Sequence, residues 1–434
     1  MTEFARRLTL FDLVLVATGA AIGSGIFRTP AQVAQAVPSL GGILGAWALG
    51  GAVTLAGALA FAELGASMPR AGGMYVWLTE AYGELVGFLY GWAYFLVVAT
   101  GAIAALAVVF AEYVGALVPM GPGTSRALAV GALVVLAVVN VVGVRIAAAV
   151  GGALTLAKLL ALAAIITLGL VLGTRTPGSG APVGAGPAGG LAAAMIGVLW
   201  SYGGWQHASF AAGEAKRPAR DVPIAMVAGT ALVTAVYLLA NVAYLRLLPL
   251  DAVVSSPHVA SDATRVAIGG LGAALVAAAV AVSALGTAGI YTLTAPRLYW
   301  AMAERRLFFP RVAELHPRWK TPVRAIVLQT CWAIVLVLAW GTFEGLVSYV
   351  VFVDWIFFGL AGAAVVVLRR RRGAPDGYRV PGYPVVPLAF VAVSGWFVAS
   401  TLRGQPKQAI AGALLLGLGV PVFAFWKRRR AAAV

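Results

Sequence analysis

Long apolar runs alternate with short polar segments along almost the whole chain. Most runs approach or exceed the ~20 residues that an α-helix needs to cross the hydrocarbon core of a bilayer, and charged residues gather between them. The pattern predicts an all-α integral membrane protein with twelve membrane-spanning helices. Their approximate ranges are 10–36, 41–66, 84–116, 127–144, 147–173, 190–214, 222–246, 266–300, 323–341, 345–368, 384–402 and 408–426.

Two of the predicted spans are interrupted. Residues 23–25 read Gly-Ser-Gly within the first span, and the sixth span contains Gly203 and Gly204 among aromatic residues. Backbone groups left unpaired in lipid cost several kcal/mol each, so a broken helix persists only where it lines a cavity or meets other protein. A glycine seam for helix packing is the alternative, but such seams need glycines at four-residue spacing. Interrupted spans in corresponding halves of a chain indicate a transporter's binding site.

The two breaks divide the chain into similar halves. Each half has five spans, and because this number is odd the halves cross the membrane in opposite directions. We predict an inverted repeat, approximately 10–173 and 190–368, followed by two extra helices at approximately 384–426. All of it forms a single transmembrane domain over residues 1–434.

The segments between the spans differ in character. Residues 68–83 are amphiphilic and are predicted to lie along the membrane surface on the inner side. Outer loops are predicted at 174–190 and at 250–265, the second with some helix, and the longest inner loop at 303–321.

The formal net charge of +16 is explained by membrane topology and not by nucleic-acid binding. With the N-terminus inside, 23 of the 31 Lys and Arg residues fall in inner segments and 6 in outer ones. An excess of Lys and Arg in cytoplasmic loops sets the orientation of membrane proteins. We therefore expect a multi-pass protein of the plasma (inner) membrane with both termini in the cytoplasm.

Composition also limits the chemistry. The chain has one cysteine, Cys331, so there is no disulfide framework. No His, Cys, Asp and Glu residues have metal-ligand spacing, and no glycine-rich phosphate loop or catalytic constellation is present. We expect no cofactor, no metal and no enzymatic activity.

The broken helices offer two kinds of backbone end. The first half of a broken helix ends in free carbonyls with partial negative charge, and the second half begins with free N–H groups and partial positive charge. A zwitterionic amino acid needs both, with its carboxylate on the amides near Ser24 and its ammonium on carbonyls near Ala21, Ile22 and Trp200–Tyr202. The predicted substrate-binding residues are Ile22, Gly23, Ser24, Gly25, Ile26, Trp200, Ser201, Tyr202, Gly203 and Trp205, with Trp200 and Tyr202 as gates.

Several charged or titratable residues fall within spans. Lys158, in the middle of span five, is costly at that depth and needs a partner or a function. Its ammonium either ties span one to span eight in place of a bound cation or exchanges a proton during transport. Arg28 either lines an entry vestibule or reaches the outer headgroups. Asp354, Glu63 and His207 are each open to a packing role, and Asp354 and His207 also to a titrating one.

Motifs spread over nearly the whole chain resemble those of the amino acid–polyamine–organocation (APC) superfamily. They are Gly-Ser-Gly-Ile-Phe at 23–27, Ala-Glu-Leu-Gly at 62–65, Pro-Arg-Ala-Gly-Gly at 69–73, Ser-Tyr-Gly-Gly-Trp at 201–205, Glu-Ala-Lys-Arg-Pro at 214–218, Ser-Ala-Leu-Gly at 283–286, His-Pro at 316–317 and Tyr-Arg-Val-Pro-Gly-Tyr-Pro at 378–384. In detail they are most similar to its L-amino-acid transporter (LAT) family.

The resemblance implies a LeuT-type fold, an α-amino-acid site at the two breaks and alternating access. It also implies that Lys158 contacts the Gly19 carbonyl and Ser283, with Thr287 nearby, and that Trp200 is a gate. The sequence departs from the family at Met74, where many members have an acidic residue, and at Arg28, where an apolar residue is usual. The loop at 117–126 lacks the cysteine by which animal light chains join a heavy chain, so no covalent partner subunit is expected.

The sequence as a whole predicts a secondary active transporter of neutral L-amino acids, working as an exchanger or with protons. No acidic residue lies in the sequence of either break, which argues against cationic substrates. A cationic amino acid or polyamine antiporter of the same superfamily remains the alternative. An amino-acid-gated channel or sensor is the alternative from another class.

Overall fold

The computed structural model describes residues 4–176, 190–256, 258–339, 343–404 and 406–432. Within these ranges the chain is mostly helical and contains no β-strand, only an isolated bridge between Leu8 and Ala215. The prediction of an all-α chain is confirmed.

Each predicted span coincides with one or more helices over most of its described residues. In the order of the twelve spans, the helices are α1 (Leu10–Ala21) with α2 (Gly25–Ala36), α3 (Leu40–Ser67), α5 (Glu84–Ala93) with the π-helical η1 (Tyr94–Val98) and α6 (Ala99–Leu117), α7 (Pro122–Val142), α8 (Val144–Leu172), α9 (Gly190–Tyr202) with α10 (His207–Phe210), α11 (Pro218–Leu247), α14 (Gly270–Glu304), α15 (Val323–Ala339), α16 (Phe343–Arg372), α17 (Val385–Gly404) and α18 (Pro406–Ala431).

Length and hydropathy support most of these spans individually. Among the described residues, nine helices are long and apolar enough to cross a membrane, and α1 with α2 forms a tenth candidate, bent by 42°. The apolar helix α15 has 17 residues, and the sixth predicted span is divided into the shorter α9 and α10. The count of twelve spans, and the inverted repeat that depends on it, therefore stay predictions.

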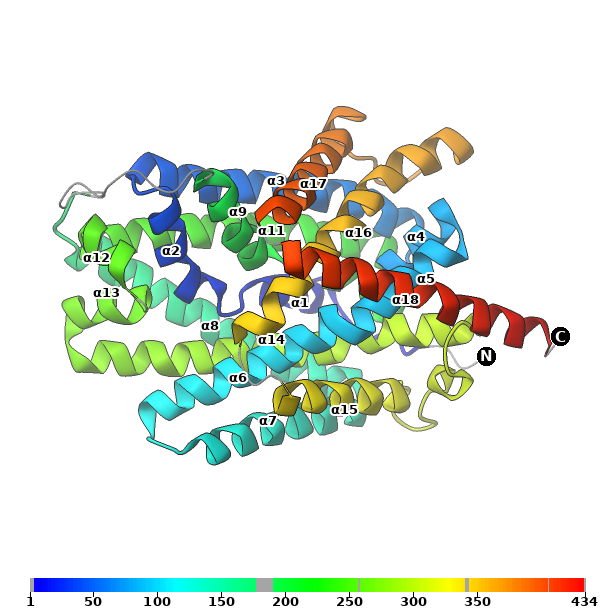
Figure 1. Ribbon diagram of the computed structural model, residues 1–434, viewed down its shortest axis with the longest axis horizontal. Coiled ribbons are helices and arrows are strands. Elements are labelled where there is room, and N and C mark those ends of the chain that lie inside the picture. The colour runs from blue at the N-terminus through cyan, green and yellow to red at the C-terminus, as the bar shows by residue number, and fades with distance from the viewer. Residues whose placement is uncertain (1–3, 177–189, 257, 340–342, 405, 433–434) are drawn as a thin grey trace.

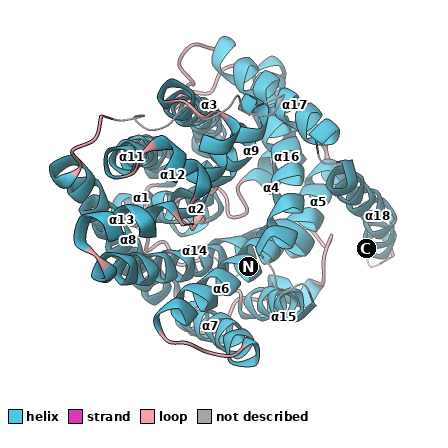
Figure 2. Ribbon diagram, turned by 60° about the vertical axis from the view of Figure 1, so that its left-hand side comes forward, coloured by secondary structure: helices cyan, strands magenta, loops and turns pink. Residues whose placement is uncertain are grey.

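The helices lie along one common direction and enclose the broken pair. Helix α1 packs against α8, α11 and α14, and α2 packs against α9. Helices α7, α15, α17 and α18 lie at the periphery (Figure 2). The burial of the apolar helices differs accordingly. Of the 18-residue apolar stretch within the central span Glu84–Leu117, 83% is buried inside the protein, but only 17% of the corresponding stretch within Ile410–Ala431. Peripheral helices thus leave their apolar faces to lipid.

The first break follows from how the backbone hydrogen bonds end and restart. Helix α1 ends as Ile22 N–H donates to the Thr18 carbonyl, and Gly23 N–H then turns back to the Ala21 carbonyl. The next helical hydrogen bond is donated by Phe27 N–H to the Ser24 carbonyl at 3.2 Å. Both helix ends therefore face the interior of the protein in the middle of the bundle.

The second break fits closely against the first. Gly203 N–H donates to the Trp200 carbonyl and His207 N–H to the Gly204 carbonyl, which closes the turn between α9 and α10. Gly204 has φ of +117°, a conformation that favours glycine. A Cβ at Gly204 would lie 2.5 Å from the carbonyl carbon and oxygen of Ala20. Glycine at 204 thus allows the two interruptions to touch.

Residues 68–83, predicted to lie along the inner membrane surface, contain a helix that is buried in the protein. Residues 74–82 form α4 (Met74–Tyr82), and seven of its nine side chains are buried. The helix packs against α5 and α16. Other helices therefore cover it, and its orientation to the membrane stays a prediction. Met74, at the position where an acidic residue is usual, is fully buried, and its sulfur accepts a hydrogen bond from the Tyr90 hydroxyl. At this position a buried apolar contact therefore stands where many members of the LAT family have an acidic side chain.

The predicted loops are partly helical. Residues 250–265 contain α12 (Leu250–Ser255) and most of α13 (Val259–Ile268), as predicted. The loop at 303–321 contains only the 3-10 turn η3 (Pro310–Ala313). Most of the loop predicted at 174–190 lies outside the described residues.

Both termini lie at the same end of the helix bundle (Figure 1). At this end, Glu63 forms an ion pair with Arg369 and accepts a hydrogen bond from Val380 N–H, so it anchors α3 to the end of α16. Glu80 pairs with Arg305 and Arg372, and the Arg372 guanidinium lowers the pKa of the Glu80 carboxyl. These ion pairs join segments that are distant in sequence.

Candidate functional site

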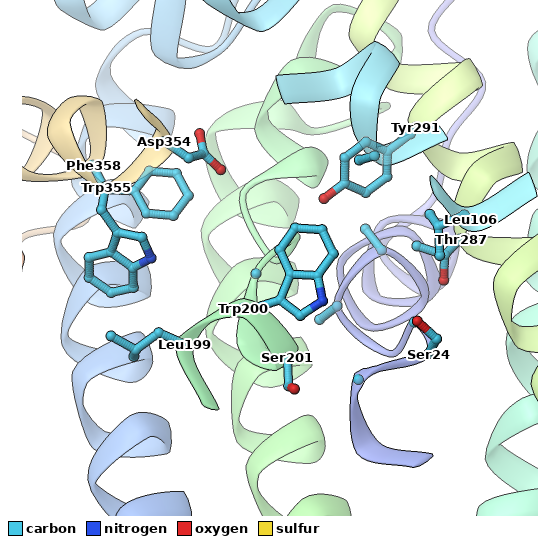
Figure 3. Close-up of a pocket in the computed structure, with 16 residues that line it drawn as sticks. Ser24, Leu106, Leu199, Trp200, Ser201, Thr287, Tyr291, Asp354, Trp355 and Phe358 are labelled. Atoms are coloured by element: carbon cyan, nitrogen blue, oxygen red, sulfur yellow. The ribbon is translucent and has the colours of Figure 1, made fainter. Parts of the chain in front are cut away.

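A small cavity lies where the two breaks meet. The space open to the centre of a water-sized sphere is about 40 Å³. The breaks, with the adjacent α1 and α9, contribute Ala20, Ala21, Gly23, Ser24, Gly25, Leu199, Trp200, Ser201 and Gly203 to its lining, and neighbouring helices contribute Ala102, Leu106, Thr287, Tyr291, Asp354, Trp355 and Phe358 (Figure 3).

The N-terminus of α2 presents donors to this cavity. The N–H groups of Ser24, Gly25 and Ile26 precede the first hydrogen bond of the helix, so they have no acceptor within it. Ser24 is the N-cap residue, yet its hydroxyl makes no capping hydrogen bond. Partial positive charge at a helix N-terminus favours an anion. A carboxylate placed in the cavity would find these donors already oriented.

Glycine at position 25 is required by the close approach of the two breaks. A Cβ at Gly25 would lie 2.4 Å from Ser201 Oγ and 3.0 Å from Ser201 Cα. Gly23 differs, because a Cβ there would make ordinary contacts of 3.7 and 3.8 Å with Leu106 and Thr287. Substituents at 23 would thus project into the cavity region without displacing the backbone.

The C-terminal end of α1 is occupied by Lys158. Its Nζ donates to the Gly19 carbonyl at 2.7 Å, to the Ile22 carbonyl at 2.5 Å and to Thr287 Oγ1 at 2.8 Å, and the side chain is fully buried. Thr287 Oγ1 is also within hydrogen-bond distance of both carbonyls. The ammonium thus joins α8, α1 and α14 at one point.

This arrangement corrects two details of the prediction. Ser283 does not meet Lys158 directly; its hydroxyl donates to the Ile22 carbonyl at 3.1 Å and to the Gly23 carbonyl at 2.9 Å. The Ile22 carbonyl was also expected to accept a substrate ammonium. A carbonyl has two lone pairs, and Lys158, Thr287 and Ser283 already contact this one. Ile22 therefore serves the protein's own contacts, and it does not line the cavity.

A tyrosine that the sequence analysis did not single out joins the ends of both first half-helices. The Tyr237 hydroxyl lies 3.0 Å from the Ala21 carbonyl and 2.8 Å from the Ser201 carbonyl. It has only one proton, so it donates to the two carbonyls in a shared or alternating manner. Both carbonyls belong to cavity-lining residues and keep acceptor capacity for an ammonium. The available signal in the sequence was a tyrosine in the middle of an apolar span, which Tyr237 shares with Tyr244.

The aromatic residues of the second break fall into two groups. Trp200 lines the cavity, between Ser201 and Tyr291 in Figure 3. Tyr202 and Trp205 do not line it. The Tyr202 hydroxyl donates to the Trp47 carbonyl at 3.0 Å, and the Trp205 ring packs on Phe61 with ring centroids 4.8 Å apart.

The substrate contact predicted for Tyr202 and Trp205, and the gate predicted for Tyr202, therefore stay predictions that this cavity does not support. Both side chains pack into the surrounding core, Tyr202 from the end of α9 and Trp205 from the turn between α9 and α10. Ile26 also lies outside the lining, fully buried in the core. Ser24, Gly23, Gly25, Ser201, Gly203 and Trp200 are brought together as predicted.

The cavity contains a carboxyl group that the sequence analysis did not place there. Asp354 of α16 lines it, and its carboxyl group and the Tyr291 hydroxyl point toward the same space in Figure 3. Its Oδ1 is buried and has no hydrogen-bond partner among the described residues. The argument that no acidic residue is available for a substrate side chain is therefore wrong, because α16 brings one from outside both breaks.

Two other titratable residues have defined partners. His207 begins α10, as predicted, and its ring is packed: Nδ1 lies 2.5 Å from Thr294 Oγ1 and Nε2 lies 3.1 Å from the Tyr94 hydroxyl. Arg28 forms an ion pair with Glu112 of α6 at 3.3 Å, and both side chains are partly exposed. Arg28 thus links α2 to α6 beside the cavity-lining part of that helix.

A buried ion pair lies between the cavity and the end that holds the termini. Arg297 Nε donates to Glu214 Oε2 at 2.8 Å and Nη2 donates to Oε1 at 2.9 Å, with exposures of 0% and 1%. Arg297 is six residues beyond Tyr291 on α14, about 9 Å at 1.5 Å per residue. Arg7 and Leu8 N–H groups donate to the Glu214 carbonyl, and the Phe4 ring covers the guanidinium. These contacts tie α14, the segment after α10 and the N-terminal segment together between the cavity and this end.

Comparison with known proteins identifies the family. The family model described as amino acid permease matches residues 8–416, nearly the whole chain. The chain belongs to the amino acid permease family. The family membership agrees with the APC resemblance and makes the protein a membrane transporter of amino acids and not an enzyme.

Individual relatives cover the chain from end to end. The serine/threonine exchanger SteT of Bacillus subtilis is 34% identical over 97% of this chain and 97% of its own length. The human b(0,+)-type amino acid transporter 1 is 30% identical over 98% of this chain and 88% of its own length. The mouse Asc-type amino acid transporter 1 is 30% identical over 98% and 82%. The chain is similar to these proteins throughout its membrane domain.

Proposed function

We propose that this permease exchanges small neutral L-amino acids by alternating access, with the substrate held between the two helix breaks. The observation that carries the proposal is the pairing of opposite backbone ends in one cavity. Free N–H groups at the start of α2 face the same space as the carbonyls of Ala21 and Ser201. Such a pair matches the carboxylate and ammonium of an α-amino acid.

The size of the cavity favours small substrates. A volume of about 40 Å³ corresponds to a few water molecules on this scale, and Trp200, Trp355 and Phe358 restrict it. Trp200 is the gate in this proposal, because it is the aromatic residue at the break that reaches the cavity. Similarity to a protein named as a serine/threonine exchanger supports both exchange and small side chains.

We expect Ser24→Leu to abolish exchange while the protein still folds. The leucine side chain would fill the carboxylate position at the start of α2, where Ser24 is 2% exposed and lines the cavity. The measurement is uptake of labelled serine into proteoliposomes preloaded with unlabelled serine. Ser67→Leu, at the exposed end of α3, is the matched control and should exchange normally.

Counterflow separates a carrier from a channel or sensor. A carrier takes up labelled serine faster when unlabelled serine is inside, whereas a pore shows no such stimulation. If no amino acid is transported or competes, or if Ser24→Leu exchanges as the wild type does, the proposed site is wrong.

A cationic substrate is the second candidate, and Asp354 is the observation that favours it. An unpartnered carboxylate oxygen in the cavity can accept from the side chain of the substrate. Short side chains that carry a hydroxyl or an ammonium would reach it more readily than long ones, because the cavity is small. Hydroxyl-bearing neutral substrates such as serine and threonine and short cationic substrates therefore share one feature, a hydrogen-bond donor on the side chain.

We expect Asp354→Asn to reduce the preference for threonine over valine by roughly fivefold. These two substrates have the same shape, and hydrogen bonds to a charged group contribute about 1 kcal/mol more than neutral ones. Competition by 2,3-diaminopropionate should fall further, because the charge is lost. The measurement is inhibition of serine exchange by each compound. Asp251→Asn, exposed on α12, is the control; an unchanged threonine-to-valine ratio in Asp354→Asn would contradict the assignment.

Orientation and partners complete the proposal. We place the end that holds both termini in the cytoplasm, because most of the Lys and Arg residues outside the spans belong to segments of that end. The membrane is the plasma (inner) membrane. The outer segment 117–126 contains no cysteine, so we propose that no covalent heavy chain is attached.

A further inference from the structure

Six basic residues line two adjoining hollows at the end of the bundle that holds the termini. One hollow, of about 560 Å³, is lined by Arg6, Arg7, Arg145 and Lys216 together with Asp12. The other, of about 300 Å³, is lined by Arg318 and Lys320 and shares Arg7 and Arg145 with the first. The two hollows therefore form one continuous basic site around Arg7 and Arg145, which we call the basic hollow.

The cations of the basic hollow lack counter-charges of their own. Among the described residues, none of the six takes part in an ion pair, although nine such pairs are found elsewhere. Asp12 supplies one negative charge against these six cations, and its carboxylate is held by Thr9 N–H at 2.8 Å and by Thr9 Oγ1 at 2.7 Å. Clustered like charges repel one another, so an anion bound among them would relieve the repulsion.

The backbone adds to this field. Helix α8 begins at Val144 with no acidic residue in its first turn and no side-chain cap, and Arg145 lies in that turn. The partial positive charge of a helix N-terminus favours an anion there and disfavours a cation. Arg145 thus adds positive charge to an end that is already positive.

The basic hollow is held in place by segments from three parts of the chain. Residues 7 and 8 are fixed by hydrogen bonds to the Glu214 carbonyl, and Lys216 N–H donates to the Leu8 carbonyl. The loop that carries Arg318 and Lys320 is fixed by Thr321 Oγ1, which donates to the Val141 carbonyl at 2.8 Å. The cations therefore surround a shaped space and are not spread along a mobile tail.

Apolar surface begins directly beside the basic hollow. Phe11 on α1 is 61% exposed and Ile146 on α8 is 48% exposed. Only 33% of the apolar part of α8 is buried in the protein, and Leu156 and Leu160 continue the exposed strip along it. A ligand with an anionic head and long apolar chains would match the hollow and the strip together. A nucleic acid or a free phosphate would leave the strip without a partner.

We propose that the basic hollow binds the phosphate headgroup of an anionic phospholipid, with the acyl chains along the exposed faces of α1 and α8. Basic pockets between transmembrane helices on the cytoplasmic side recognise such headgroups. Phosphate oxygens accept hydrogen bonds from Arg and Lys, and the shared Arg7 and Arg145 contact the headgroup from two sides. This site is separate from the amino-acid cavity, so it does not depend on the identity of the substrate.

The test compares two double variants of equal charge. Arg7→Gln/Arg145→Gln removes the two cations common to both hollows. Arg370→Gln/Arg428→Gln removes two exposed cations from α16 and α18 that do not line them. The measurement is native mass spectrometry of the full-length protein in detergent with added phosphatidylglycerol, phosphatidylcholine or glycerol 3-phosphate. Serine counterflow of each variant verifies that it is folded.

We expect the wild type and the control variant to retain phosphatidylglycerol in clear preference to phosphatidylcholine. Arg7→Gln/Arg145→Gln should retain roughly 30-fold less, since each cation beside a membrane surface contributes about fivefold to binding. Equal losses in both variants would show a diffuse charge effect and overturn the proposal. Binding of glycerol 3-phosphate as strong as that of the lipid would also overturn it, because the acyl chains would then have no part.

Discussion

Replacing Lys158 with alanine is expected to reduce amino-acid exchange at least about a hundredfold. The Lys158 ammonium donates to the Gly19 and Ile22 carbonyls and to Thr287. Hydrogen bonds from a charged group contribute about 1.5–3 kcal/mol each. The loss of only two of the three corresponds to about 3 kcal/mol or more, which lowers the exchange rate by a factor of at least about 100. The loss would appear as disorder at the C-terminal end of α1, next to the residues that line the cavity.

The measurement is serine uptake as a function of pH, with and without internal serine, for the wild type and Lys158→Ala. Lys427→Ala, exposed on α18, is the control and should behave as the wild type does. If Lys158 ties the helices together, exchange is lost at every pH. If it instead exchanges a proton, the variant keeps counterflow and loses only the dependence of uptake on pH. Full activity of Lys158→Ala would contradict both interpretations.

Glu214→Gln is expected to lower the free energy of unfolding by about 3–5 kcal/mol. The Arg297 guanidinium is completely buried and makes two hydrogen bonds with the Glu214 carboxylate. Removing one partner of a buried pair leaves the other charge without compensation, and this costs about that amount. The N-terminal segment would be destabilised at the same time, because Glu214 also holds residues 7 and 8 through its carbonyl.

Thermal unfolding in detergent measures this effect. Glu314→Gln is the matched control, because Glu314 pairs with Arg324 at the surface with exposures of 60% and 49%, and exposed pairs contribute about 0–1 kcal/mol. The double variant Glu214→Leu/Arg297→Met should recover much of the lost stability, since no unpaired charge remains buried. An equal shift for Glu214→Gln and Glu314→Gln would show that the buried pair has no special role.

At the breaks, the sequence alone predicts the backbone donor groups but not the acceptor groups that a substrate can use. Gly-Ser-Gly at 23–25 interrupts an apolar run, and a helix that stops there must expose N–H and C=O groups whatever surrounds it. The donors of Ser24 and Gly25 could therefore be predicted from the sequence. The acceptors could not be predicted, because a carbonyl is available to a substrate only if no side chain of the protein already donates to it. The Ile22 carbonyl accepts a hydrogen bond from the Lys158 ammonium, and Lys158 is 136 residues away in the sequence.

Side-chain direction was the second quantity that the local pattern left open. Trp200, Tyr202 and Trp205 are all aromatic and all lie at one break, so composition does not distinguish them. The turn of α9 directs Trp200 to the cavity, whereas Tyr202 packs against Trp47 and Tyr237 and Trp205 packs against Phe61. The core on that side of the break decides which ring lines the cavity.

By itself, the sequence determined the all-α membrane class, the positions of the two breaks and the chemistry of their backbone ends. These depend on apolar runs of bilayer length and on glycines within them, which are local properties of the chain. Only the tertiary structure decided that Tyr237 bridges the Ala21 and Ser201 carbonyls, that Asp354 enters the cavity and that residues 74–82 are buried. Each of these depends on how helices distant in sequence pack around α1, and no local pattern of residues encodes that packing.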